Sequence, residues 1–137
     1  MSSAVWYGYL ENTIFSRVKK GLSSTYDGTI NFTSLSKSPT TSELPTCYIH
    51  ELAGLERGMT LDNQNVNAVL CNIQIDIYAA SKADCNKITR LAVQQMKNLK
   101  FNVVAMPLVD DSNTDVIHSI ARFRRLIGVG DKDIVVV

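Results

Sequence analysis

Hydrophobic and polar residues alternate along residues 69–78, which read VLCNIQIDIY. The odd-numbered positions from Val69 to Ile77 are apolar, and most even-numbered positions from Leu70 to Tyr78 are polar. Side chains alternate between the two faces of a strand, so this pattern predicts a strand with one face on a core and a polar opposite face. Such one-sided strands are more typical of antiparallel than of parallel sheets.

A first amphipathic helix is predicted over residues 6–22. Its apolar side chains recur every three or four positions, at Trp6, Leu10, Ile14, Phe15, Val18 and Leu22. Lys19 and Lys20 would lie in the last turn, where the helix dipole favours cations. Gly21 then marks the expected end of the helix.

A second helix is predicted over residues 82–99. Ser81 stands at the N-cap position and Asp84 follows three residues later, which makes a capping-box-like pair. The stripe of this helix that would face the core consists of Cys85, Ile88, Leu91, Ala92, Gln95, Met96 and Leu99. We interpret Met96 as a packing residue rather than a ligand.

Four further strands are predicted around the alternating one, at residues 29–33, 46–52, 101–109 and 116–127. Pro107 indicates an edge position or a bulge. Residues 34–45 would form a loop, and residues 53–65 a long hairpin connection. The order of elements predicts an α+β fold in a single domain over residues 1–137. Its mainly antiparallel sheet would have about four to five strands, with two principal helices packed on one face.

The last predicted strand contains the sequence RFRRL, with arginines at positions 122, 124 and 125. Arg122 and Arg124 would share the polar face with His118, while Phe123 faces the core. Arg125 falls in the core register, so we expect a bulge or a strand end near positions 124 and 125.

Two interpretations of this cluster remain open. In the first, the arginines face solvent or another protein and pair with Asn72, Gln74 and Asp76 of a neighbouring strand, with Arg122 or Arg124 bonded to Asp76. In the alternative, the Arg122–Arg125 strand is the platform of a small nucleic-acid-binding module. The net charge of +1 supplies no basic field of the kind that polyanion-binding proteins carry. Arginine is also common at protein interfaces, so we favour protein contact.

Composition indicates an ordinary globular domain, with 45% hydrophobic and 20% charged residues in 137. The three cysteines, Cys47, Cys71 and Cys85, are odd in number and lack CxxC spacing. We therefore interpret them as small core residues of a protein in a reducing compartment.

No catalytic or metal-binding pattern stands out in the sequence. His50 and His118 lie on different predicted strands, without a ligand partner three or four positions further on. Cys47 and His50 would point to opposite faces of their strand. The acidic turn at residues 110–115 lacks the EF-hand spacing. We expect no enzyme activity, no catalytic residue, no metal and no cofactor.

The N-terminal sequence has neither the basic start nor the apolar block of a signal peptide. No apolar run reaches the ~20 residues that a membrane helix needs. The expectation is a protein that folds in the cytoplasm and has no membrane partner.

Residues 65–101, together with the RFRRL strand and the upstream PTCYIHEL strand, resemble the tail terminator, or tail-completion, proteins of long-tailed bacteriophages. The shared pattern is a strand ending in I-x-I-x-I-Y-A, a short polar link, and a helix that carries D-x-x-x-I and ends in L-x-F. The resemblance covers about residues 10–127 and consists mainly of hydrophobicity patterns. This chain departs from many relatives in a longer 34–45 loop and in its IVVV end.

The resemblance implies helices packed on a mainly antiparallel sheet, in a homo-hexameric ring. Such a ring caps the tail tube, ends tube polymerisation and provides the head-joining interface. The implied partners are other copies of the chain, the tail tube protein and a head completion or connector protein, with DNA in the ring lumen as an open alternative. The implied location is the head-proximal end of the virion tail, after assembly in the host cytoplasm.

Candidate contact residues lie in the RFRRL strand, on the polar face of the alternating strand and in the long connection. They are Arg122, Arg124, Arg125, Asp76, Glu56, Arg57 and Met59. Residues 133–137, DIVVV, are β-branched and nearly uncharged, so we predict that they add as a strand to their own sheet or to a neighbour's. A frayed tail is the alternative.

Overall fold

The computed structural model describes residues 9–34, 39, 43–52, 57–59, 66–110, 115–128 and 130–135, with the backbone alone at 57–59, 66, 67 and 106–108. Within these residues the elements are α1 (Leu10–Thr25), β1 (Asn31–Thr33), β2 (Thr46–Glu51), β3 (Arg57–Met59), β4 (Val66–Ala79), α2 (Lys82–Asn98), β5 (Asn102–Asp110) and β6 (Ile117–Gly128). The fold is α+β, as predicted, with two helices and six strands in the described part.

The strands form one mixed, mainly antiparallel sheet in the order β1-β2-β4-β6-β5, and β3 pairs with β4. The central strands β4 and β6 pair from Ala68–Gly128 to Ala79–Ile117 without a register shift. Strand β1 runs parallel to β2. Strand β3 is one more than the expected four to five, and it lies inside the 53–65 segment that was predicted to be a connection.

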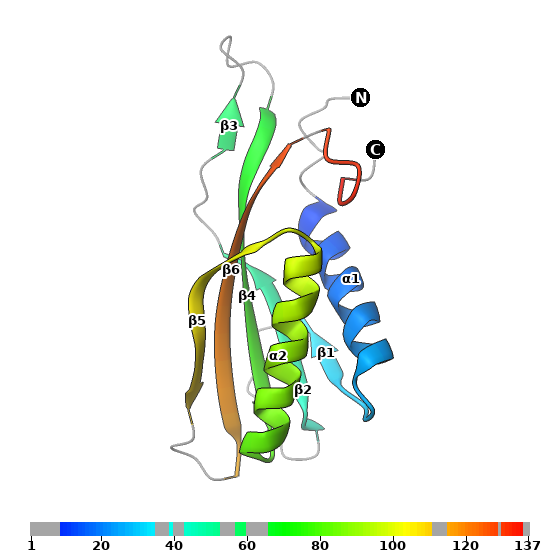
Figure 1. Cartoon of the computed structure of the whole chain (residues 1–137), viewed down its shortest axis with the longest axis vertical. Coiled ribbons are helices and arrows are strands. Elements are labelled where there is room, and N and C mark those ends of the chain that lie inside the picture. Colours follow the sequence, from blue (N-terminus) through cyan, green and yellow to red (C-terminus); the bar gives the residue numbers. More distant parts are fainter. Residues whose placement is uncertain are drawn as a thin grey trace.

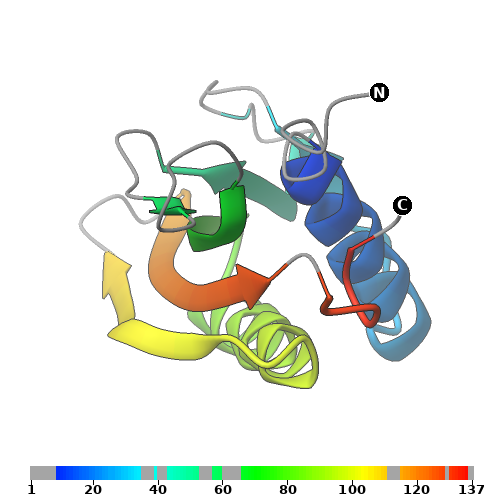
Figure 2. The same cartoon turned by 90° about the horizontal axis from the view of Figure 1, so that it is seen from above.

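Both helices pack on the same face of the sheet (Figures 1 and 2). Their buried side chains join those of the odd-numbered strand positions in one hydrophobic core. Its largest fully buried members include Leu10, Ile14, Leu22, Ile49, Ile73, Ile75, Ile88, Met96 and Phe123. The prediction of one core face and one polar face along β4 is therefore confirmed.

Helix α1 continues past the end that was predicted near Gly21 and Leu22 and reaches Thr25. Lys19 and Lys20 consequently lie outside its last turn. Gly21 instead lies inside α1 beside the Gln95 side chain of α2, since a Cβ atom there would lie 2.0 Å from Oε1 of Gln95. Residues 6–8 of the predicted helix lie outside the described residues.

Helix α2 has the predicted N-cap, since the hydroxyl of Ser81 accepts a hydrogen bond from the Asp84 amide at 3.2 Å. At its C-terminal end Lys100 has a φ of 64°, a left-handed conformation. The Lys100 amide donates to the Lys97 carbonyl at 2.9 Å, and the Phe101 amide donates to the Met96 carbonyl at 3.0 Å. These two bonds are the pattern of a Schellman motif with lysine at the position where glycine is usual.

Strand β5 lies at one edge of the sheet. Its register with β6 shifts between Val103 and Ala105 and again between Ala105 and Leu108. Both the edge position and the irregularity predicted from Pro107 are confirmed.

The C-terminal residues follow a different path from the predicted one. Residues 131–135 form a turn in which the Ile134 and Val135 amides donate to the Asp131 carbonyl. Ile134 and Val135 are buried in the core. The strand prediction is therefore wrong for residues 133–135. It assumed that this apolar segment would be an exposed edge, but Ile134 and Val135 are buried in the protein's own core.

All three cysteines are buried, which confirms their interpretation as core residues. Burial raises the pKa of Cys47 and Cys71 well above the ordinary thiol value. Both side chains therefore stay protonated and act as small apolar groups.

Candidate functional site: the open face of the sheet

The face of the sheet that the helices leave uncovered is called the open face below (Figure 1). It carries the even-numbered residues of β2, β4 and β6 in the described part of the chain. They include Tyr48, His50, Asn72, Gln74, Asp76, Tyr78, His118, Ile120, Arg122, Arg124 and Leu126. Three neighbouring strands thus contribute one continuous surface that is mostly polar.

The centre of the open face is the carboxylate of Asp76, which lies between two histidines. His118 Nε2 is 2.8 Å from Asp76 Oδ2, and His50 Nε2 is 3.5 Å from Oδ1. Gln74 donates to Oδ1 at 2.8 Å. Strand β4 runs between β2 and β6, so one histidine reaches the carboxylate from each side.

Each histidine is stacked on a tyrosine. The ring centroids of Tyr48 and His50 are 4.1 Å apart with an interplanar angle of 8°, and those of Tyr78 and His118 are 4.2 Å apart at 10°. Stacking of this kind restricts the side-chain rotamers. It holds both imidazoles over the sheet with Nε2 directed at Asp76.

The environment of Asp76 keeps it ionised. Burial opposes ionisation, but hydrogen bonds from His118 and Gln74 and the charges of the two histidines outweigh it, so the pKa of Asp76 lies below its ordinary value. Burial also raises the pKa of Tyr78, with Asp76 as the next cause. The carboxylate is already bonded on both oxygens, so its arrangement suits a rigid structural anion better than a free general base.

Arg122 and Arg124 project from β6 on the same face. Arg122 Nε donates to Gln74 Oε1 at 2.9 Å, and Arg124 Nε donates to Asn72 Oδ1 at 3.0 Å. The predicted pairing with the polar residues of β4 is confirmed for both amides. The predicted ion pair with Asp76 is wrong, because the histidines occupy that carboxylate.

Arg125 lies on the helix-covered face, where its side chain is 8% exposed. Its Nη1 donates to the Leu99 carbonyl at 2.6 Å, and both Nη atoms donate to the Asp133 carboxylate at 3.0 Å. The register of β6 with β4 is continuous through this position. The predicted bulge or strand end near Arg124 and Arg125 is therefore wrong, since β6 continues to Gly128. A local carboxylate and a carbonyl satisfy the buried guanidinium without any distortion of the strand.

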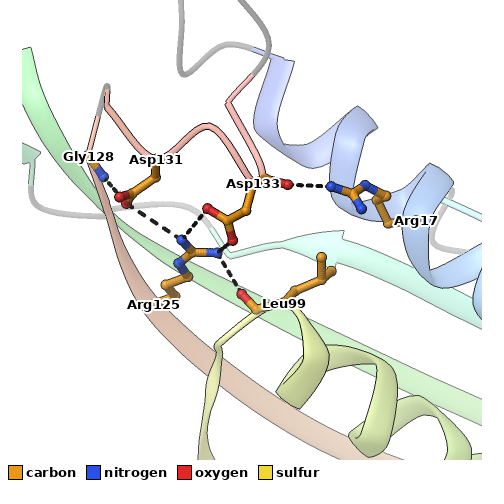
Figure 3. Close-up of polar contacts among 6 residues, drawn as sticks. All are labelled: Arg17, Leu99, Arg125, Gly128, Asp131 and Asp133. Carbon is orange, nitrogen blue, oxygen red and sulfur yellow. Dashed lines mark hydrogen bonds and ion pairs between the residues drawn. The ribbon is translucent and has the colours of Figure 1, made fainter.

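Figure 3 shows how this cluster fastens the C-terminal turn. Asp131 approaches the Arg125 guanidinium at 3.6 Å and accepts a hydrogen bond from the Gly128 amide at 2.8 Å. The backbone carbonyl of Asp133 accepts from Arg17 of α1. Hydrogen bonds from Arg125 lower the pKa of Asp133. Arg125 is thus an internal cross-link, whereas it was a candidate contact residue in the sequence.

The remaining candidate contacts are Glu56, Arg57 and Met59. Glu56 lies outside the described residues, and the structure describes only the backbone of Arg57 and Met59. In β3, Arg57 pairs with Val69, and Met59 with Val66. The structure therefore places the backbone of two of these three residues beside β4, away from the Asp76 centre.

Sequence reasoning placed His50 and His118 on strand faces but did not bring them together. The available signal was the shared polar register of His50, Asp76 and His118. To predict that these three side chains lie together, one also needs the strand order, which alternation alone does not determine.

Among the described residues, no group of three His, Cys, Asp or Glu side chains is placed to hold a metal ion. A groove of about 460 Å³ lies between α2 and β5, lined in part by Arg90, Val93, Lys97 and Val103.

None of the helices in the described part of the chain has the length and apolar character needed to span a membrane.

A scan of the sequence against protein-family models found no match, and a search of curated proteins found none either.

Proposed function

We propose that the protein is a structural subunit of a bacteriophage tail. In this role it forms a hexameric ring at the head-proximal end of the tail tube, ends polymerisation of the tube and provides the surface that joins the head. It acts through contacts between macromolecules and catalyses no reaction. The proposal takes its specific assignment from the resemblance to tail terminator proteins.

The observation that carries the proposal is the open face itself. Its polar side chains are held by hydrogen bonds and ring stacking rather than left mobile. Small-molecule sites are usually concave and largely apolar, whereas broad ordered faces with arginine and aromatic residues are typical of protein interfaces. A surface of this kind supports an assembly role.

A ring follows naturally from such a subunit. If one surface of a chain binds a different surface of the next copy, repetition about an axis closes into a ring. The two sides of this sheet differ completely, with helices on one and a polar face on the other. A one-sided subunit of this kind suits head-to-tail contacts between copies and leaves further surface for the tube.

The proposal is tested by sedimentation velocity of the full chain, alone and with tubes assembled from the tail tube protein of the same genome. We expect a hexamer, or a monomer that sediments with the tubes. Arg124→Glu should retain the far-UV circular dichroism spectrum and lose assembly, because the reversed charge lies on the open face. Arg90→Glu, on the exposed side of α2, is the matched control and should assemble normally.

Two results would contradict this function. One is a protein that remains monomeric both alone and beside tubes. The other is an oligonucleotide complex that forms readily and weakens steeply with salt, which would favour the nucleic-acid-binding alternative on the Arg122–Arg125 strand.

A further inference from the structure

We propose that Arg122, Arg124 and Leu126 form a docking site for an acidic segment of a partner protein, one that presents carboxylates beside an apolar side chain. The inference rests on the proposed assembly role, because it takes the partner to be a protein. It adds the chemistry by which that partner is recognised.

The three residues form a single row along β6. They occupy alternate positions of the strand and therefore point to the same face, with roughly 7 Å between successive side chains. All three are exposed, and the exposed fraction of Leu126 is 63%. The row thus offers two cations followed by one large apolar side chain.

Each guanidinium retains most of its hydrogen-bonding capacity. Arg122 and Arg124 use Nε to bond the amide oxygens of Gln74 and Asn72. Four further N–H donors remain on the terminal nitrogens of each group. Neither group forms an ion pair with any carboxylate in the described part of the chain. The terminal nitrogens of each guanidinium group can therefore bind a carboxylate through two parallel hydrogen bonds.

The network behind Arg122 fixes it in advance. Gln74 accepts from Arg122 and donates to Asp76, and Asp76 is in turn held by His118. A preorganised side chain loses less conformational entropy when a ligand binds. Arg124 has one such anchor, Asn72, and serves as the second cation of the pair.

Charge complementarity identifies the partner as acidic. Asp76, the carboxylate two positions beyond Gln74 on β4, is already bonded by Gln74 and flanked by two histidines. It does not neutralise the arginines. A site with two oriented guanidinium groups and no carboxylate partner among the described residues favours carboxylates from another molecule, in bidentate geometry.

The exposed leucine favours a protein over a nucleic acid. Leu126 follows Arg124 in the row, and its large apolar side chain is exposed. A phosphate backbone forms no apolar contact with an exposed leucine, whereas an acidic peptide with apolar residues does. The net charge of +1 also lacks the broad basic field of nucleic-acid-binding proteins.

The test uses a synthetic peptide of alternating glutamate and leucine, added to the full-length protein. We expect it to shift the Nε–H NMR signals of Arg122 and Arg124. The double variant Arg122→Gln/Arg124→Gln should bind roughly tenfold more weakly or worse, since it removes charge-assisted hydrogen bonds. Arg90→Gln on α2 is the control and should bind as the wild type does, and a glutamine–leucine peptide should not bind.

The inference is overturned if the peptide does not bind, if Arg90→Gln weakens binding as much as the double variant, or if an oligo-dT strand binds the arginine row more tightly than the peptide. Sedimentation of the same samples separates this inference from the proposed function. A hexamer that does not bind the peptide overturns the docking site alone. If the peptide binds to a chain that stays monomeric and does not sediment with tubes, the proposed ring is overturned and the docking site is retained.

Discussion

Arg124 and Arg125 are neighbours in the chain, but their side chains lie on opposite faces of β6. Arg124 is exposed and bonded to Asn72, while Arg125 is buried and bonded to Asp133 and to the Leu99 carbonyl. The same residue type therefore stabilises the fold at one position and remains available for contact at the next.

Replacing each arginine by methionine should separate these roles, since methionine keeps an unbranched stem and removes the charge. We expect Arg125→Met to lower the free energy of unfolding by about 1–3 kcal/mol, because buried acceptors lose their donor. Arg124→Met should change it by less than about 0.5 kcal/mol. Urea denaturation measures both, and equal losses in the two variants would contradict the assignment of Arg125 as the internal cross-link.

Asp76 should give the protein a specific sensitivity to acid. Its pKa is lowered in the folded state, so its contribution to stability is fully present above the unfolded value of about 3.9 and is lost as the pH falls through the folded value. Asp76→Asn should therefore reduce the difference in unfolding free energy between pH 7 and pH 3. Urea denaturation at the two pH values measures this difference.

The control for the acid experiment is Asp27→Asn, since the Asp27 side chain is 82% exposed and forms an ion pair with the surface residue Lys87 at 3.3 Å. Some pH dependence should persist in Asp76→Asn, because Arg125 also lowers the pKa of Asp133. An unchanged pH dependence in Asp76→Asn would mean that the histidine contacts do not stabilise the carboxylate.

At the scale of elements, periodicity predicted both helices and most strands because burial is one-sided in each of them. Alternation placed Ile75 in the core and Gln74 on the open face, and the Ser81 cap fixed the start of α2. Periodicity did not detect the three-residue strand β3, which lies within the segment that was predicted to be a connection. It also missed the extension of α1, since the reason that Gly21 is tolerated inside it lies on another helix, at Gln95.

The end of α2 offers a test of backbone strain. Lys100 adopts a left-handed conformation that costs a residue with a Cβ atom roughly 1 kcal/mol. Lys100→Gly should therefore raise the free energy of unfolding by up to about 1 kcal/mol. The matched control Asn98→Gly, at the last residue of the same helix, should lower it by up to about 0.5 kcal/mol. Thermal and urea denaturation check both, and destabilisation by Lys100→Gly would show that the lysine side chain matters more than its backbone.

At the scale of the whole molecule, the C-terminal turn ties together parts of the chain that are distant in sequence. Arg125 and Arg17 hold Asp133 from β6 and α1, and the Leu99 carbonyl adds the end of α2. Ile134 packs into the common core directly after these contacts. Local pattern analysis missed this arrangement because each of its bonds joins different elements.

Truncating the side chain of Ile134 should reveal how much the turn contributes. Ile134→Ala should lower the free energy of unfolding by about 2–5 kcal/mol, because it leaves a cavity at a position that is 1% exposed. Lys132→Ala, on the exposed side of the same turn, should have little effect. Calorimetry measures the stability of both variants. A negligible loss of stability in Ile134→Ala would restore the frayed-tail interpretation.

The position of β6 has a consequence for synthesis in the cell. It lies between β4 and β5, although it is the last strand of the sheet along the chain. A nascent polypeptide that has left the ribosome as far as β5 therefore has a gap in the middle of its sheet, with a long edge of β4 unpaired. Such an edge invites pairing with other chains. Prematurely terminated products should consequently aggregate or recruit chaperones, and the protein should complete its fold only after β6 emerges.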